Sequence, residues 1–138
     1  MWLLGRLGTI SEEKAAQMAP LALAYVGDSV YDIYVRTKLV SEHDCGAGAL
    51  HSMSVGVVNA KAQADFARFV KDDLTGREKD VFRRGRNTKS ITIPKNMSAA
   101  DYCYATAIEA VMGYLYLSGQ HERLSDLLSG VMITDPQG

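Results

Sequence analysis

The sequence predicts an all-α protein that folds as a single domain over residues 1–138. Apolar residues recur at helical spacing through most of the chain, whereas the alternation typical of strands is nearly absent. Hydrophobic residues make up 47% of the composition and charged residues 22%, which is enough apolar material for a proper core. The strand-like stretch Ser90–Ile93 is too short and isolated to form a sheet.

Start and stop signals place the helices of the first half. Ser11 is a typical N-cap for a short helix over Glu12–Met18. A long apolar helix follows over Pro20–Val40, with the proline in its first turn. A weaker turn of helix is expected over Ala47–Met53, and apolar positions on one face predict a further helix within Val57–Lys71.

Two capping boxes organise the second half. Thr75 and Glu78 form the first box, which opens a helix that Gly85 can end. The second box, Ser98–Asp101, opens the longest helical pattern of the chain, Ala99–Leu117, and a glycine follows it. A last helix is expected over 121–129, and the tail over 134–138 is expected to fray.

An aspartate interrupts the apolar pattern of the long first-half helix. Asp28 stands within Leu21–Val35, which is apolar nearly all round and therefore predicts a buried helix. A buried carboxylate needs a partner to offset its lost hydration, and that partner could be a metal ion, an arginine or a cap. Asp32, one turn further on, is expected at the solvent edge of the helix rather than as a third ligand.

A second acid lies in the apolar helix of the other half. Glu109 shares its face with Gly113, and a helical glycine indicates close approach by another helix. Gly27, beside Asp28, indicates the same on the other helix, so a crossing at these glycines would bring the two carboxylates together. Such a pair would suit a hard divalent cation, Mg²⁺ or Mn²⁺, although each acid taken alone would more often pair with a lysine, arginine or tyrosine.

The charge of the chain is unevenly distributed around a net value of −1. The segment Phe82–Ala100 holds five basic residues and no acid, and its glycine, serine, threonine and asparagine residues suit a loop that binds phosphates. Phosphate contacts, a metal and paired acids together point to phosphodiester hydrolysis.

Several other classes of protein are disfavoured. Cys45 and Cys103 lie far apart without a C-x-x-C pair, so we expect two small core residues rather than a zinc site or a disulfide. No stretch has the length of a membrane span, and no secretory signal precedes Pro20. A cytoplasmic protein without a membrane partner is therefore expected.

Several motifs then resemble one family. Tyr25–Val30 resembles the signature helix of ribonuclease III, and Ile108–Leu117 resembles its second acidic helix. The Mini-ribonuclease III branch is the closer match, and the resemblance covers roughly 20–128. The motifs that resemble this branch are Leu21–Tyr25, Val58–Ala64, Arg84–Ser90 and Pro94–Asn96.

The resemblance implies a homodimeric endonuclease of helical fold that cuts double-stranded RNA with Mg²⁺, for which Mn²⁺ can substitute, and that has no separate RNA-binding domain. Asp28 and Glu109 would be the catalytic and metal-binding carboxylates. The implied substrate is precursor 23S ribosomal RNA, and a ribosomal protein that presents it is a further expected partner. The residues expected to contact RNA are His51, Lys61, Arg83, Arg84, Arg86, Asn87, Lys89 and Lys95.

Two departures from the larger ribonuclease III enzymes bear on the metal. Where those enzymes carry further acids, this chain has Ala24 and Thr106, as the Mini branch does. We therefore expect activity to be kept, with weak metal binding in the absence of RNA. The alternatives that remain are a non-catalytic RNA-binding or ribosome-assembly module and, more remotely, a helical dimer without an RNA role.

Overall fold

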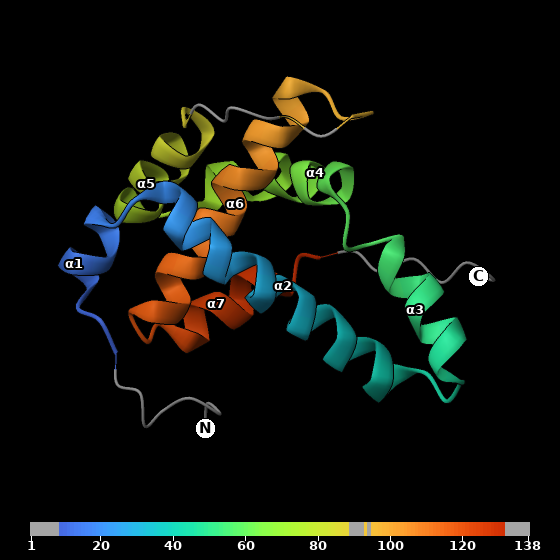
Figure 1. The fold of residues 1–138 in the computed structure, drawn as a ribbon. Coiled ribbons are helices and arrows are strands. Elements are labelled where there is room, and N and C mark those ends of the chain that lie inside the picture. The colour runs from blue at the N-terminus through green and yellow to red at the C-terminus, as the bar shows by residue number, and fades with distance from the viewer. Residues whose placement is uncertain (1–8, 89–92, 94, 132–138) are drawn as a thin grey trace.

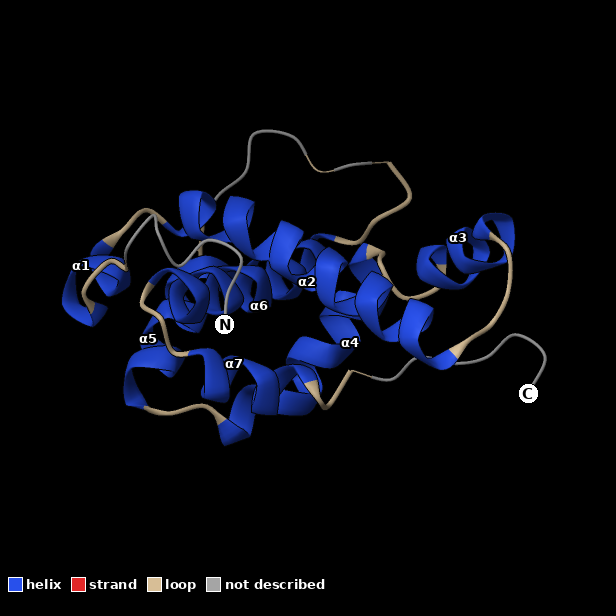
Figure 2. Ribbon diagram, turned by 90° about the horizontal axis from the view of Figure 1, so that it is seen from below, coloured by secondary structure: helices blue, strands red, loops and turns tan. Residues whose placement is uncertain are grey.

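The computed structural model describes residues 9–88, 93 and 95–131. Every regular element in this part is helical, which confirms the all-α prediction (Figures 1 and 2). Ser90–Thr92 and the tail over 134–138 lie outside the described residues. The elements are α1 (Glu12–Gln17), α2 (Pro20–Glu42), α3 (Ala47–Val55), α4 (Ala60–Val70), the 3₁₀ turn η2 (Lys71–Asp73), α5 (Gly76–Arg86), α6 (Ala99–Leu117) and α7 (His121–Leu128).

Helix α6 is the centre of the molecule. Its residues from Ala105 to Leu115 are buried except for Glu109, and α2, α4 and α5 pack around it (Figure 1). Helix α7 turns back beneath it, and α3 packs on α2 at the opposite end of the molecule from α1 (Figure 2). The alanines and glycine of α6 let its neighbours approach closely.

Helix α2 has two different faces, so the prediction that it is buried all round is wrong. Leu23, Val35 and Leu39 on its inner face are buried against the core. Its outer face exposes an apolar stripe, with Tyr25 82% exposed. Because α6 and its neighbours cover only one side of α2, hydropathy alone overstates its burial. The stripe consists of Leu21, Tyr25, Ile33 and Val40.

The helix ends follow the predicted caps in most cases. The Ser11 hydroxyl accepts from the Lys14 amide, and the Glu78 carboxylate accepts from the Thr75 amide at 3.1 Å. The Ser98 hydroxyl accepts from the amide at position 101 at 3.0 Å. Gly119 follows α6 with a φ of 74°, which favours glycine.

Gly85 does not end α5, contrary to the prediction. The helix continues through it to Arg86, and Gly85 is buried against α6. A Cβ placed on Gly85 would lie 3.0 Å from the Cα of Ala107. This glycine therefore serves a close helix contact rather than a helix end.

The cysteines differ in part from the expected core positions. Both are free thiols, but Cys45 is exposed and Cys103 is half-buried. Among the described residues, none of the helices has the length and apolar character needed to cross a membrane.

Candidate active site at the crossing of α2 and α6

Two glycines allow the backbones of α2 and α6 to touch. A Cβ on Gly27 would lie 1.8 Å from the carbonyl oxygen of Glu109, and one on Gly113 would lie 1.9 Å from that of Leu23. Real Cβ atoms do not approach so closely, so each position requires glycine. The predicted crossing at these residues is confirmed.

The crossing brings the two acidic side chains together. The carboxyl of Glu109 forms a hydrogen bond with Asp28, across the contact that Gly27 makes possible. Burial, followed by this bond and by the negative charge of Asp28, raises the pKa of Glu109 to about 8. Asp28 is exposed and Glu109 is half-buried, so the predicted burial of Asp28 is wrong although its pairing is confirmed.

The surroundings bear on which partner the acids have. Asp28 lies in the middle of α2 and so is not a cap, and Asp32 pairs with Arg36 at 3.0 Å. Within residues 9–88, 93 and 95–131, no lysine or arginine forms an ion pair with Asp28 or Glu109. Two adjacent carboxylates, one exposed and one half-buried, are a donor set that fits a hard divalent cation.

The site contains few other ligands. Ala24 is buried, and the Thr106 hydroxyl donates to the Tyr102 carbonyl at 2.9 Å within its own helix. The part of the chain that the structure describes contains no group of three or more histidine, cysteine, aspartate or glutamate side chains that could hold a metal. Asp28 and Glu109 are thus a pair of protein carboxylates rather than part of a larger cluster.

A tyrosine that the sequence analysis did not single out supports this region. Tyr31 is 1% exposed, and its hydroxyl donates to the Val57 carbonyl at 3.0 Å. Burial and the nearby charge of Glu109 raise its pKa to about 12, so it stays protonated. The hydrogen bond ties α2 to the segment before α4. The hydroxyl of a buried tyrosine usually has a hydrogen-bond partner, so a tyrosine on the inner face of α2 could have indicated such a contact from the sequence.

The residues predicted to contact RNA fall into several settings. On α5, Arg86 is exposed, and Arg83 is exposed and paired with Asp80. Asn87, which follows α5, and Lys95 are also exposed. Lys89 lies outside the described residues.

The remaining predicted contacts are more distant or engaged elsewhere. Lys61 on α4 pairs with Asp65 at 3.3 Å. His51 on α3 lines a 270 Å³ groove against the C-terminal half of α2, at the end of the molecule away from the α2–α6 crossing (Figure 1). Arg84 differs most from the prediction, since its guanidinium donates to the backbone carbonyls of Ala16 and Met18.

Comparison with known proteins identifies the family. The model of the ribonuclease III domain matches residues 21–120, which include both carboxylates of the crossing. A Mini-ribonuclease 3 from Thermoanaerobacter sp. is 45% identical over 86% of this chain and 84% of its own length. The chain belongs to the Mini-ribonuclease 3 branch of the ribonuclease III family.

Other relatives agree in sequence and in structure. The Mini-ribonuclease 3 of Clostridium tetani is 44% identical over 88% of this chain and 82% of its own length. The Mini-ribonuclease 3 of Staphylococcus aureus is 44% identical over 82% of this chain and 86% of its own length. The crystal structure of protein FN1578 from Fusobacterium nucleatum superposes with a TM-score of 0.75 at 26% identity, covering 82% of this chain and 90% of that one. As a Mini-ribonuclease 3, the chain is an endoribonuclease that acts on double-stranded RNA.

Proposed function

We propose that Asp28 and Glu109 are the catalytic carboxylates and that they hold a divalent cation, Mg²⁺ or its substitute Mn²⁺, for cleavage of double-stranded RNA. The observation that carries the proposal is the contact of these two carboxylates at the glycine crossing. When bound, the cation supplies an activated water and neutralises charge on the phosphate.

The two acids have unequal tasks in this proposal. Glu109 is half-buried on the central helix and provides a fixed oxygen ligand once its proton is lost. Asp28 is exposed beside it and presents its carboxylate toward solvent, from which RNA approaches. Because Ala24 and Thr106 add no ligand, we expect the cation to bind weakly until RNA supplies further oxygens.

Basic residues and one asparagine provide the proposed RNA contacts. Arg83 and Arg86 on α5, with Asn87, Lys89 and Lys95 in the connection to α6, form the main set. Lys61 and His51 are more distant additions. Such contacts follow the A-form backbone more than the bases, so affinity falls steeply with salt.

The biological setting is proposed from the resemblance to Mini-ribonuclease III. We propose that the protein acts as a cytoplasmic homodimer on precursor 23S ribosomal RNA, with a ribosomal protein that presents the substrate. The apolar stripe on α2 supports a dimer, because a second copy would remove this surface from water.

One experiment tests the proposed chemistry. A labelled RNA duplex is incubated with the protein in Mg²⁺ and in EDTA, with a single strand of the same sequence as the control. We expect cleavage of the duplex in Mg²⁺ and none in EDTA. Cleavage that persists in EDTA would contradict metal dependence, and protection without cleavage would favour a non-catalytic RNA-binding module.

A further inference from the structure

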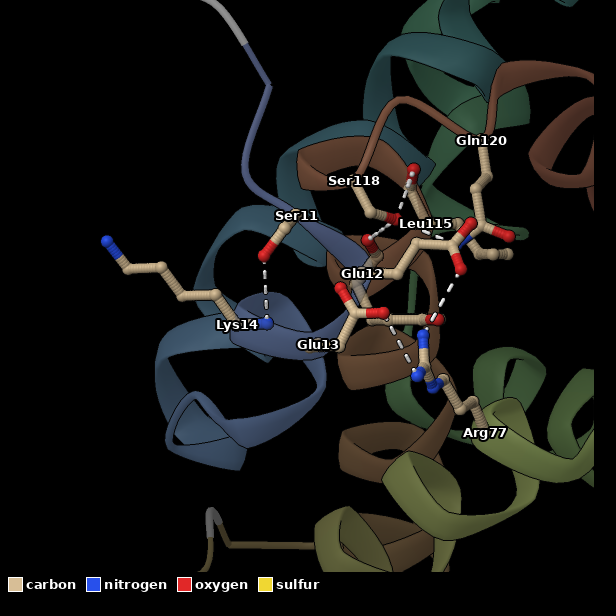
Figure 3. Close-up of polar contacts among 9 residues, drawn as sticks. Ser11, Glu12, Glu13, Lys14, Arg77, Leu115, Ser118 and Gln120 are labelled. Carbon is tan, nitrogen blue, oxygen red and sulfur yellow. Dashed lines mark hydrogen bonds and ion pairs between the residues drawn. The ribbon is translucent and has the colours of Figure 1, made fainter.

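Helix α1 is short, yet α5 holds it at both ends. Near its N-terminus, Arg77 of α5 pairs with Glu12 at 3.2 Å and with Glu13 at 3.3 Å (Figure 3). Just before α1, the Ile10 amide donates to the carbonyl of Leu117 at the end of α6, at 2.8 Å. The residues that precede α2 are thus anchored on α5 and α6.

Arg84 makes the contact at the other end of α1. Its guanidinium donates through one terminal nitrogen to the Ala16 carbonyl and through the other to the Met18 carbonyl, the latter at 3.2 Å. The last carbonyls of a helix lack helical partners and carry partial negative charge, so a cation there is favourable. Met18 lies two residues before Pro20, where α2 begins. Arg84 therefore joins α5 to the end of α1, directly before the helix that carries Asp28.

The next residue fixes α5 against the other half of the site. A Cβ on Gly85 would lie 3.0 Å from the Cα of Ala107 and 3.2 Å from the Cβ of Ala110. These two α6 residues stand on either side of Glu109 in the sequence. Arg84 and Gly85 together link α5 to the end of α1, which leads into α2, and to α6.

Arg84 also differs from its basic neighbours. Arg83 and Arg86 are exposed, whereas Arg84 is half-buried and both terminal nitrogens of its guanidinium are engaged by backbone carbonyls. A planar guanidinium can bind two carbonyls at once, which a lysine cannot do in the same way. These contacts leave Arg84 poorly placed to contact RNA.

We propose that Arg84 is a positioning residue for cleavage rather than an RNA contact. By holding the connection between α1 and α2 against α5, it sets the direction in which Arg83 and Arg86 present RNA to Asp28 and Glu109. This role rests on the proposed metal-dependent cleavage of duplex RNA by those carboxylates. It also gives the residues before Pro20 a part in the reaction, as a brace between α5 and α2.

The test compares four variants of the full chain in steady-state cleavage of a duplex, with binding measured at several salt concentrations. For Arg84→Met we expect kcat to fall about ten- to a hundredfold with KM within about twofold of wild type, because misplaced RNA reacts poorly although it still binds. Arg84→Lys keeps the charge but not the contact with two carbonyls, so its kcat should lie between those of Arg84→Met and wild type. For Arg86→Met we expect a higher KM and a salt slope shallower by about one. Lys14→Met removes an exposed charge from α1 and should match wild type.

The outcomes separate this role from the proposed function. If Arg84→Met raises KM and flattens the salt slope with kcat unchanged, Arg84 contacts RNA directly and the positioning role is overturned. Wild-type kcat and KM in Arg84→Met would also overturn it. Should Arg84→Met be too unstable to assay, an unchanged kcat in Arg84→Lys overturns the role and a reduced kcat at constant KM supports it. Failure of the wild-type chain to cleave would instead overturn the proposed function itself.

Discussion

At the scale of single residues, the proposed cleavage depends on the contact between Asp28 and Glu109. Each acid taken alone resembles an ordinary charged residue of a helix. Burial of Glu109, followed by its hydrogen bond with Asp28 and the negative charge of Asp28, raises the pKa of Glu109 to about 8, so the pair resists carrying two negative charges. The consequences for activity and for pH dependence can be measured separately.

Removing either negative charge should stop cleavage without preventing RNA binding. For Asp28→Asn and Glu109→Gln we expect kcat to fall more than about a hundredfold, as when a group that stabilises the transition state is lost. Duplex affinity in EDTA should stay close to wild type, because the proposed RNA contacts lie elsewhere. Cleavage assays and gel-shift titrations check both parts, and a variant that cuts at the wild-type rate would refute the assignment of that residue.

The stability of the metal-free protein should fall as the pH rises. The ordinary pKa of Glu109 is 4.5 and its folded value is about 8, so the fold favours the protonated form. The contribution of this group is therefore greatest below pH 4.5, declines between 4.5 and 8, and is constant above. In EDTA we expect the Tm of wild type to drop several degrees over this range relative to Glu109→Gln.

Magnesium provides the control for that measurement. A cation binds the deprotonated form of Glu109, so Mg²⁺ should raise the Tm of wild type most at the upper end of the pH range. It should have little effect on Glu109→Gln. Equal pH profiles for the two proteins in EDTA would show that Glu109 does not hold an unusual proton.

At the scale of helices, an ion pair between a buried carboxylate and a half-buried arginine joins α5 to α7. Glu78 is 2% exposed, and Arg123 donates to its carboxylate at 2.8 Å. Burial pushes the pKa of Glu78 upward, but the hydrogen bonds from Arg123 and the Thr75 amide outweigh this and the pKa is lowered. The stabilising contribution is present above the ordinary pKa of 4.5 and is lost as the pH falls through the folded value.

Breaking this pair should destabilise the fold markedly. Arg123→Met leaves the Glu78 carboxylate buried without its cation, and we expect a loss of about 2–4 kcal/mol in the free energy of unfolding at pH 7. Arg36→Met, which removes an exposed pair with Asp32, should cost less than about 0.5 kcal/mol. Urea unfolding at pH 7 and pH 4 measures the free energy of unfolding of both variants. Similar losses in Arg123→Met and Arg36→Met would contradict the stated role of Arg123.

The glycine contact between α2 and α6 makes a separate prediction. Gly27→Ala would place a methyl group 1.8 Å from a backbone oxygen, so the helices must separate, and we expect a loss of more than about 3 kcal/mol. Gly48→Ala on α3 is the matched control, since a Cβ there meets nothing within 4 Å, and it should stabilise by about 0.5–1 kcal/mol. Equal thermal melting of the two variants would show that the crossing can relax.

The sequence predicted the helices and their crossing better than it predicted which surfaces are covered. Gly27 and Gly113 indicated the approach of α2 and α6 because glycine in a helix needs a reason. Hydropathy could not show that Tyr25 faces away from the core. The hydropathy of an apolar side chain is the same whether its own chain or a second copy covers it. The basic run around Arg84 showed that the residue lies in a positively charged segment, but it could not show the direction in which the side chain points.

At the scale of the whole molecule, the exposed stripe of α2 predicts self-association. Tyr25→Asp should place a charge in the proposed dimer surface and shift the protein toward monomer. Light scattering coupled to size-exclusion chromatography measures the mass, and we expect about half of the wild-type value at equal concentration. Lys79→Asp, at an exposed position of α5 rather than of α2, should keep the wild-type mass. A monomeric wild-type chain would contradict the proposed homodimer.

The backbone contact at positions 27 and 113 has a consequence for how inactive variants are interpreted. Every single-nucleotide change that alters a glycine codon introduces a side chain or a stop, and no side chain fits between α2 and α6. In a random library screened for lost activity, these two positions should therefore score as strongly as the two acids beside them. At this crossing, a map of inactivating substitutions would mark four residues, although only two of them have a proposed chemical role.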